Sequence, residues 1–236
     1  HNATLLLQNP HDAENEQKIR ERFDALRQVY GYDAILIDET GRKVGGAGQH
    51  AELAGVIVHG PLPRAMQSGQ VQRSELYRDA TGDIHLDYVV PLPLQQVANR
   101  VAILLHTPVE HFLFPLIQRW PTPSPSAETM LVRRDGDQVL FLNELRHQRR
   151  TALTLRTPLN AHVPPSLAVK TGGIQHMETR DRRGVTVLAA SRPVAGTSWF
   201  VVAKVDRDEV YAPLKRLALW VSLITFAAVI ALLAVI

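Results

Sequence analysis

Cysteine is absent from this chain of 236 residues. Without a thiol, the protein can form neither a disulfide nor a thiolate zinc site, and it has no cysteine nucleophile. The Gly-x-Ser-x-Gly motif of many serine hydrolases is also missing. Gly45, Gly46 and Gly48 are not followed by the Lys-Ser/Thr pair that completes a phosphate-binding loop. We therefore assign no catalytic residue.

Strong charge of one sign is missing as well. The formal net charge is +3, from 26 basic and 23 acidic residues. Basic residues gather only in small groups at 146–150 and 180–183, and the sequence holds no dense basic stripe. Because nucleic-acid-binding proteins usually carry such a stripe, we expect no nucleic-acid partner.

The ten histidines do not follow the spacing of a metal motif. No two of them are three or four residues apart, and no cysteine is available to help. We predict that they are surface or structural residues, and we expect neither a metal site nor a cofactor.

Residues 217–236 form one long apolar run without a charge, proline or glycine, and Ser222 and Thr225 are its only polar side chains. About 20 such residues in a helix span the roughly 30 Å hydrocarbon core of a bilayer. Lys215 and Arg216 precede the run, and Trp220 lies near its start. Aromatic anchors favour that position. We predict a transmembrane helix; the alternative is a buried C-terminal helix of a soluble protein.

The two ends of the chain suggest that it is a fragment. His1 is not a natural start, and the chain stops at the end of the apolar run. We expect that an N-terminal span preceded His1 and that a further domain followed Ile236 across the membrane.

The residues before the apolar run predict alternating helices and strands. Ile19, Phe23 and Leu26 recur at helical spacing, which predicts a helix over residues 12–30. Asn9-Pro10 or Asp12 could cap its start. We further expect a hairpin at 33–44, a short helix near 63–67, strands at 74–79, 84–92 and 100–106, and turns at 81–83 and 95–99.

Two helix starts have the pattern of a capping box. Thr107 is followed by Pro108 and, at the third position, Glu110; Asp206 is followed in the same way by Glu209. Between these two starts, three prolines interleaved with Thr and Ser at residues 121–126 predict a stiff linker.

The second half of the sequence repeats the first. Leu36 matches Leu131, an offset of 95 residues, and Gly41 matches Gly136 at the same offset. Closing strands and a capped helix recur in the same order, which indicates an internal duplication. Each unit is predicted to be an antiparallel sheet of five strands with helices on one face, an α+β layer.

Two segments carry a resemblance to a known family. Residues 127–147, Ala-Glu-Thr-Met-Leu-Val-Arg-Arg-Asp-Gly-Asp-Gln-Val-Leu-Phe-Leu-Asn-Glu-Leu-Arg-His, and residues 181–188, Asp-Arg-Arg-Gly-Val-Thr-Val-Leu, resemble the sensor segment of many proteobacterial signalling proteins. With the duplication and the apolar run, the chain resembles a double Cache sensor domain, which has two tandem PAS-like modules. The Arg-x-Trp-Tyr run of the amino-acid-binding subfamily is missing, so amino-acid specificity is not implied.

This resemblance implies a domain organisation. Residues 1–31 would form an N-terminal helix, 32–120 the membrane-distal module and 121–126 the linker. Residues 127–206 would form the membrane-proximal module, and 207–236 the exit helix with the transmembrane helix.

The resemblance also implies a function. The chain would be the periplasmic sensor of a homodimeric receptor in the bacterial inner membrane, with a histidine kinase as the first choice of output and a diguanylate cyclase as the alternative. Two other hypotheses are a membrane-anchored extracytoplasmic hydrolase and a module that binds a partner protein.

Polar side chains on the central strands and the variable insert suggest a binding pocket for a small polar or anionic ligand, because arginine can hold a carboxylate or phosphate with two hydrogen bonds. His85 and Asp87 alternate onto one strand face, and Tyr88 lies on the other. The distal candidates are Arg64, Arg73, Tyr77, His85, Asp87 and Tyr88. The analogous second choice in the proximal module is Arg146, Arg180, Asp181 and Arg182.

Overall fold

The structure is a computed structural model that describes residues 13–46, 55–93, 100–173 and 175–235. The chain divides into two compact units, the first ending at Pro115 and the second beginning at Leu116. The fold is mixed α+β with antiparallel sheets, as predicted. The predicted cap at Asn9-Pro10 or Asp12 and the turn at 95–99 lie outside the described residues.

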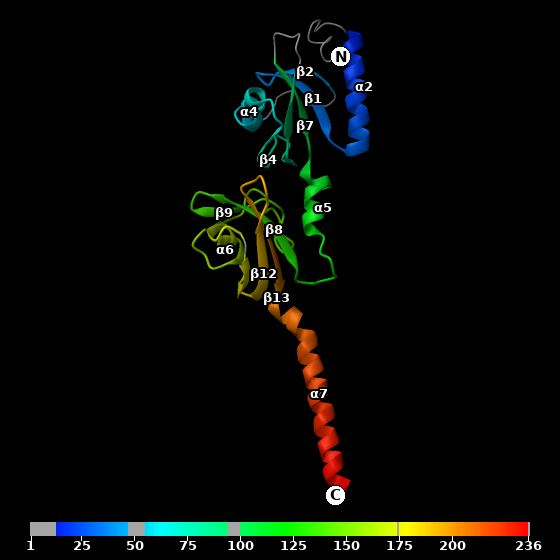
Figure 1. The fold of residues 1–236 in the computed structure, drawn as a ribbon, viewed down its shortest axis with the longest axis vertical. Helices are drawn as coiled ribbons and strands as arrows, with labels where there is room; N and C mark the ends of the chain where they lie inside the picture. The colour runs from blue at the N-terminus through cyan, green and yellow to red at the C-terminus, as the bar shows by residue number, and fades with distance from the viewer. Residues whose placement is uncertain (1–12, 47–54, 94–99, 174, 236) are drawn as a thin grey trace. The chain divides into compact units, whose positions relative to one another are not determined.

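The first unit is built on a five-stranded antiparallel sheet in the order β2-β1-β7-β6-β3 (Figure 1). A separate two-stranded ribbon pairs β4 with β5. Its elements are α2 (Ala13–Tyr30), β1 (Asp33–Asp38), β2 (Lys43–Gly46), α3 (Gly55–Val58), α4 (Pro61–Ser68), β3 (Gln72–Arg73), β4 (Tyr77–Arg78), β5 (Ile84–His85), β6 (Tyr88–Leu92), β7 (Val101–His106), the 3-10 helix η1 (Val109–His111) and α5 (Leu113–Gln118), which crosses the unit boundary.

Helices cover both faces of the first sheet, whereas the sequence predicts only one covered face. Leu36 points toward α2, where it packs with Ile19. Its neighbours Ile35 and Ile37 point the opposite way and pack with Leu62 of α4. This alternation follows from the two-residue repeat of a strand. All three strand residues are apolar because both faces are buried.

The second unit has a six-stranded antiparallel sheet in the order β10-β9-β8-β13-β12-β11. The expected number was five; the extra strand is β10, which pairs with β9 at the sheet edge. Its elements are β8 (Glu128–Asp135), β9 (Gln138–Phe141), β10 (Arg156–Pro158), α6 (Pro164–Lys170), β11 (Gln175–Arg180), β12 (Thr186–Pro193), β13 (Trp199–Asp206) and α7 (Arg207–Val235).

The duplication predicted from the sequence is present in the topology. Apart from β10, the second sheet repeats the strand order of the first, with β8 between β9 and β13 as β1 lies between β2 and β7. The pairing register agrees: Leu36 lies opposite Ile103, and its match Leu131 lies opposite Val201. The second half therefore copies not only the order of the elements but also the side-chain positions on the sheet.

One long predicted hairpin in the first unit is interrupted. The strand expected at 84–92 breaks into β5 and β6, whereas the strand expected at 74–79 is reduced to β4, with β3 just before it. The break occurs where the hydroxyl of Ser74 accepts a hydrogen bond from the backbone N–H of Asp87 at 2.9 Å. The Ser74 hydroxyl thus replaces one backbone acceptor of the ladder, while the Ser74 N–H still donates to the carbonyl of Asp87 at 2.8 Å.

Both predicted capping boxes are wrong. The carboxylate of Glu110 accepts a hydrogen bond from the backbone N–H of Ile84 at 3.2 Å, and η1 begins without a side-chain cap. The carboxylate of Glu209 accepts hydrogen bonds from Ser124 and Ser126 of the linker. Donors that are distant in sequence therefore bind the two carboxylates, which in a capping box would accept hydrogen bonds from their own helix.

Candidate functional site

Five polar side chains meet where the first sheet joins its ribbon, and we call this group the histidine cluster. It comprises Tyr77, Asp79, His85, Asp87 and His106. Asp87, which is fully buried, lies at its centre. Its carboxylate accepts a hydrogen bond of 2.6 Å from the Tyr77 hydroxyl and lies 3.0 Å from Nδ1 of His106.

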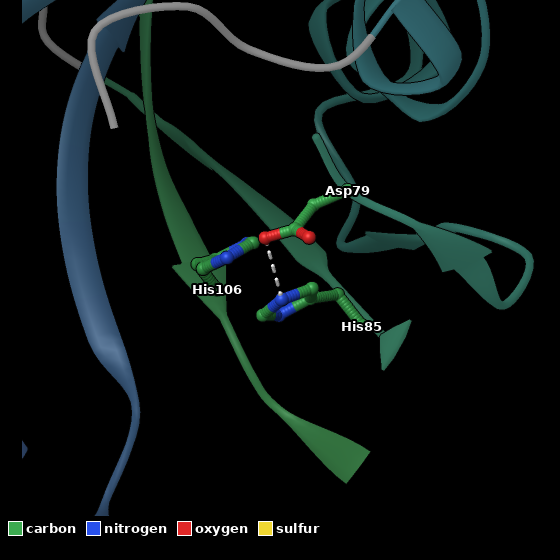
Figure 2. A group of neighbouring side chains, drawn as sticks. All are labelled: Asp79, His85 and His106. Atoms are coloured by element: carbon green, nitrogen blue, oxygen red, sulfur yellow. Dashed lines mark hydrogen bonds and ion pairs between the residues drawn. The ribbon is translucent and has the colours of Figure 1, made fainter. Parts of the chain in front are cut away.

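Asp79 forms the other side of the histidine cluster (Figure 2). Its Oδ1 accepts hydrogen bonds of 2.9 Å from the backbone N–H groups of Thr81 and Asp83, which fixes the carboxylate in the β4–β5 turn. Its Oδ2 lies 3.1 Å from Nε2 of His85. The rings of His85 and His106 stack at 3.8 Å with an interplanar angle of 18°. The carboxylate therefore faces two adjacent imidazoles.

Burial and neighbouring charges shift the pKa values in the histidine cluster. Burial and the nearby charge of Asp87 raise the pKa of Tyr77 well above its usual range, so the phenol keeps its proton. Burial, together with the charge of His106, lowers the pKa of His85. Burial opposes ionisation of Asp79, but hydrogen bonds from Thr81 and Asp83 outweigh it and lower the pKa to about 2.

The structure brings together half of the distal candidates. Tyr77, His85 and Asp87 belong to the histidine cluster. Among the described residues, Arg64 lies exposed on α4 and Tyr88 half-buried on β6, both outside the hydrogen bonds and ring contacts that define the cluster. Arg73, on β3, lies 3.9 Å from Glu75.

Sequence reasoning missed Asp79 and His106. Motifs based on residue spacing cannot find them, because the cluster brings together the β4–β5 hairpin and the end of β7, which are distant in the sequence.

A second polar group, the lysine cluster, lies in the second unit and comprises Glu128, Asp181, Arg183 and Lys204. Nζ of Lys204 lies 3.0 Å from Glu128 and 2.6 Å from Asp181, and all three side chains are buried. Burial would raise the pKa of Asp181, but hydrogen bonds from Lys204 and Arg183 hold it below its usual value. A cavity of about 100 Å³ adjoins this cluster.

A larger cavity of about 840 Å³, the arginine cleft, opens between the linker and the loop after β9. Arg146, Arg149 and Arg150 contribute the basic side chains of its lining, and Glu128 and Glu144 the acidic ones. The loop contains two residues in the left-handed region, Arg150 and Leu153, each with φ of 57°. Such conformations in residues other than glycine are uncommon and tend to occur near functional sites.

Three of the four proximal candidates line one or the other of these two cavities. Arg146 lines the arginine cleft, and its guanidinium donates hydrogen bonds to the carbonyls of Ser124 and Ala127. Asp181 and Arg182 line the smaller cavity, where the Arg182 guanidinium also donates to the Thr157 hydroxyl at 2.8 Å. Arg180 is exposed on β11 and lines neither of them.

Helix α7 is long and apolar enough to cross a membrane over Arg207–Ala231. None of that window is buried in the structure, unlike the core helix of a soluble protein. Glu209 in its first turn is tied to the linker: its carboxylate accepts hydrogen bonds from the Ser124 hydroxyl at 2.6 Å and from the Ser126 N–H at 3.1 Å.

No family model and no curated protein matches the chain, but solved structures do. The ligand-binding domain of the Pseudomonas aeruginosa PAO1 amino acid chemoreceptor PctB, in complex with L-Arg, has a TM-score of 0.57 at 18% identity, over 89% of this chain and 85% of that one. The sensor domain of the V. cholerae histidine kinase DctB has a TM-score of 0.55 at 13% identity, over 87% and 84%.

A third match is the ligand-binding domain of the Campylobacter jejuni chemoreceptor Tlp3 in complex with 4-methylisoleucine, with a TM-score of 0.59 at 14% identity, over 85% and 76%. At these identities the likeness establishes the fold, which is that of Cache-type sensor domains. The predicted resemblance is confirmed at that level. Domains of this fold occur in both histidine kinases and chemoreceptors, so the fold does not assign the output.

Proposed function

We propose that this chain is the extracytoplasmic ligand-sensing domain of a membrane-bound bacterial signalling receptor. One observation carries the proposal: the last strand of the second sheet continues directly into the apolar helix. β13 ends at Asp206 and α7 begins at Arg207, with no loop between them. A change in the sheet is thereby delivered to the membrane helix, as a switching transition requires.

The arginine cleft is the proposed binding site for a small anionic ligand. Its carboxylates already have partners: Glu128 pairs with Lys204, and Glu144 accepts a hydrogen bond of 3.0 Å from the Thr151 N–H. Arg149 and Arg150 add positive charge to the exposed lining. Guanidinium groups favour carboxylate or phosphate ligands, which they can bind through paired hydrogen bonds.

A short chain of hydrogen bonds leads from this cleft to α7. Arg146 donates to the carbonyl of Ser124 at 2.8 Å, and the Ser124 hydroxyl donates to Glu209 at 2.6 Å. Ser126 accepts the N–H of Asp206 at 2.9 Å, so the linker holds the junction between strand and helix. A ligand that moves Arg146 would therefore bias the position of α7, to the extent that it binds one arrangement more tightly.

The parent protein, in this proposal, is a homodimeric sensor histidine kinase of the inner membrane with its sensor in the periplasm, and a diguanylate cyclase is the alternative output. Solved histidine kinase sensors have the same fold, which is compatible with the first choice, but chemoreceptor domains have it as well. Translation of the gene beyond Ile236 tests it: a phosphoacceptor helix and an ATP-binding domain are expected, and a cyclase domain would overturn the kinase assignment.

A thermal-shift screen of the whole chain in detergent micelles tests ligand sensing. The library contains organic acids, amino acids, polyamines, nucleobases and inorganic anions. A ligand at 100 times its dissociation constant stabilises the folded state by about 2.7 kcal/mol. We expect an anionic hit that Arg149→Gln abolishes.

The matched control is Arg180→Gln, which changes an exposed arginine outside both cavities. A hit that survives Arg149→Gln would move the site away from the arginine cleft. Absence of any hit would contradict small-molecule sensing.

A further inference from the structure

The two polar clusters occupy equivalent places in the duplicated sheets. Asp33 lies opposite His106 on the paired strands β1 and β7, and Glu128 lies opposite Lys204 on β8 and β13. Asp33 and Glu128 are separated by 95 residues, the offset of the repeat. His106 therefore stands in the first unit where Lys204 stands in the second.

The acidic partners are equivalent as well. Asp79 and Asp181 each begin a tight turn in which their carbonyl accepts the N–H of the glycine three residues later, at 3.2 and 2.9 Å. In each case Oδ1 accepts two further N–H groups of the turn. Oδ2 is left to face the interior, toward His85 in the first unit and Lys204 in the second.

A second imidazole completes the difference between the units. His85 forms an isolated β-bridge with Pro108, which lies two residues after His106. In the second unit, Asp206 lies two residues after Lys204, and it pairs with Val187. Val187 therefore occupies the position that His85 has in the first unit. The second unit thus contains an internal ammonium between two carboxylates. The first unit has instead two imidazoles beside one carboxylate, with another carboxylate behind them.

We propose that the histidine cluster binds a divalent transition-metal ion, Zn²⁺ in the first instance, through Asp79, His85 and His106. The potential ligand atoms of these three residues all lie within 4.8 Å of one another. In a tetrahedral zinc site with bonds near 2.1 Å, ligand atoms are about 3.4 Å apart. Side-chain rotations can therefore bring them around one ion.

The chemistry of the group selects the class of ion. Two imidazole nitrogens and one carboxylate oxygen suit zinc, copper or nickel, whereas Mg²⁺ and Ca²⁺ prefer sets of oxygen ligands. Three protein ligands leave a fourth position for water or an exogenous ligand. Here a divalent ion would supply the positive charge that Lys204 supplies in the second unit.

Asp87 acts in this site as a positioning residue. Its hydrogen bond with Nδ1 of His106 presents the opposite ring nitrogen, Nε2, as the metal ligand, a common arrangement around zinc. Tyr77 and the Thr107 N–H hold Asp87 in turn, at 2.6 and 3.3 Å. The carboxylate that orients His106 is therefore buried and is itself held in place by hydrogen bonds.

Metal binding must disturb the ring stack. A lone pair of imidazole lies in the plane of its ring, so two nearly parallel rings cannot both point at one ion. The stack of His85 on His106 shown in Figure 2 has to open, by rotation of at least one ring. His85 lies on β5 of the ribbon and His106 on β7 of the main sheet, so a bound ion would link these two parts of the unit.

Calorimetric titration with ZnCl₂ tests the site in the whole chain, after treatment with a chelator and in detergent micelles. We expect one ion per chain. His85→Gln, His106→Gln and Asp79→Asn should each remove this binding, and Asp87→Asn should weaken it by about 10- to 100-fold. MgCl₂ is the negative control ion. His59→Gln, an exposed histidine in the same unit, is the matched control and should bind as the unchanged chain does.

Co²⁺ in place of Zn²⁺ provides a readout that does not depend on folding stability. A tetrahedral Co²⁺ absorption band that appears in the unchanged chain and in Asp87→Asn, but not in His85→Gln, supports the site. Circular dichroism identifies variants that remain folded.

Zinc binding that persists in folded His85→Gln and His106→Gln, or that His59→Gln also removes, overturns the proposal. This test is independent of the test of the proposed function. Loss of zinc binding should leave anion binding in the arginine cleft unaffected, and loss of anion binding should leave zinc binding unaffected.

Discussion

The two units have different buried polar groups at equivalent positions of their sheets. In the second, buried Glu128 and Asp181 flank the ammonium of Lys204 at 3.0 and 2.6 Å. In the first, the equivalent strand position holds His106, and its carboxylate neighbour Asp87 is fully buried. One duplicated sheet therefore has an internal cation, and the other has side chains suited to bind one.

This difference separates an ion pair that is complete within the chain from a candidate metal site. A buried ion pair within the chain is complete as soon as the sheet forms, and nothing outside needs to bind. A cluster of imidazoles and carboxylates has a charge that depends on what binds to it. The position beside the last strand is therefore free to acquire different functions in the two copies while the topology stays the same.

The largest predicted effect comes from breaking the lysine cluster. Lys204→Met leaves Glu128 and Asp181 buried without their shared cation, and we expect a loss of about 3–5 kcal/mol in the free energy of unfolding. Guanidinium denaturation followed by circular dichroism measures it. The equivalent change His106→Gln, without metal, should cost no more than about 1.5 kcal/mol, a typical hydrogen bond. Equal losses would contradict the asymmetry.

A matched pair of turn substitutions gives the next effect. Asparagine keeps Oδ1, so Asp181→Asn and Asp79→Asn both preserve the turn hydrogen bonds, while the charge is lost and the acceptor Oδ2 becomes an NH₂ donor. Asp181→Asn should cost about 2–3 kcal/mol because it faces Lys204 and Arg183, and Asp79→Asn about 1 kcal/mol. The same denaturation assay compares them. If Asp79→Asn lowers the free energy of unfolding more than Asp181→Asn does, the histidine cluster contributes more to stability than the lysine cluster, and this prediction is wrong.

The contribution of Asp181 should also depend on pH. Its pKa in the folded protein lies below the usual value of 3.8, so the carboxylate stabilises the folded state fully above the unfolded-state pKa. That stabilisation is lost as the pH falls through the lower folded-state pKa. The difference in unfolding free energy between the unchanged chain and Asp181→Asn should be constant at neutral pH and shrink below about pH 4. A difference that persists at the acid limit would indicate that packing, and not charge, sets the cost.

The smallest effect is expected at an exposed ion pair. Lys18 and Glu14 on α2 lie 2.5 Å apart, with side chains 49% and 78% exposed. Lys18→Ala should change the unfolding free energy by at most about 0.5 kcal/mol, because solvent screens exposed pairs. A loss comparable to that of Lys204→Met would show that exposure does not account for the difference between these ion pairs.

The sequence predicts the architecture well because the architecture rests on local patterns. Helical spacing locates α2, the turn chemistry after Asp38 locates the first hairpin, and the repeat of Leu36 at Leu131 predicts a second copy with the same topology. These signals depend on neighbours within a few residues, or on similarity between the copies.

The sites are predicted less well because they depend on contacts that the sequence does not show. Glu110 and Glu209 look like local helix caps, yet tertiary donors take both carboxylates. His85 and His106 lie 21 residues apart, so a search for closely spaced ligands passes over them. The repeat does contain one usable signal: at the last strand, where the offset is 98 residues instead of 95, His106 aligns with Lys204, so a polar residue recurs at this position.

The most direct test of the central claim, that ligand binding in the second unit is delivered to α7, uses the absence of cysteine. Arg180→Cys on β11 and Leu219→Cys on α7 provide two exposed sites for spin labels, and double electron–electron resonance in lipid nanodiscs measures the distance between them. The account predicts that a saturating anionic ligand shifts this distance distribution and that Glu209→Gln, which weakens the tie to the linker, reduces the shift. An unchanged distribution at ligand saturation would contradict it.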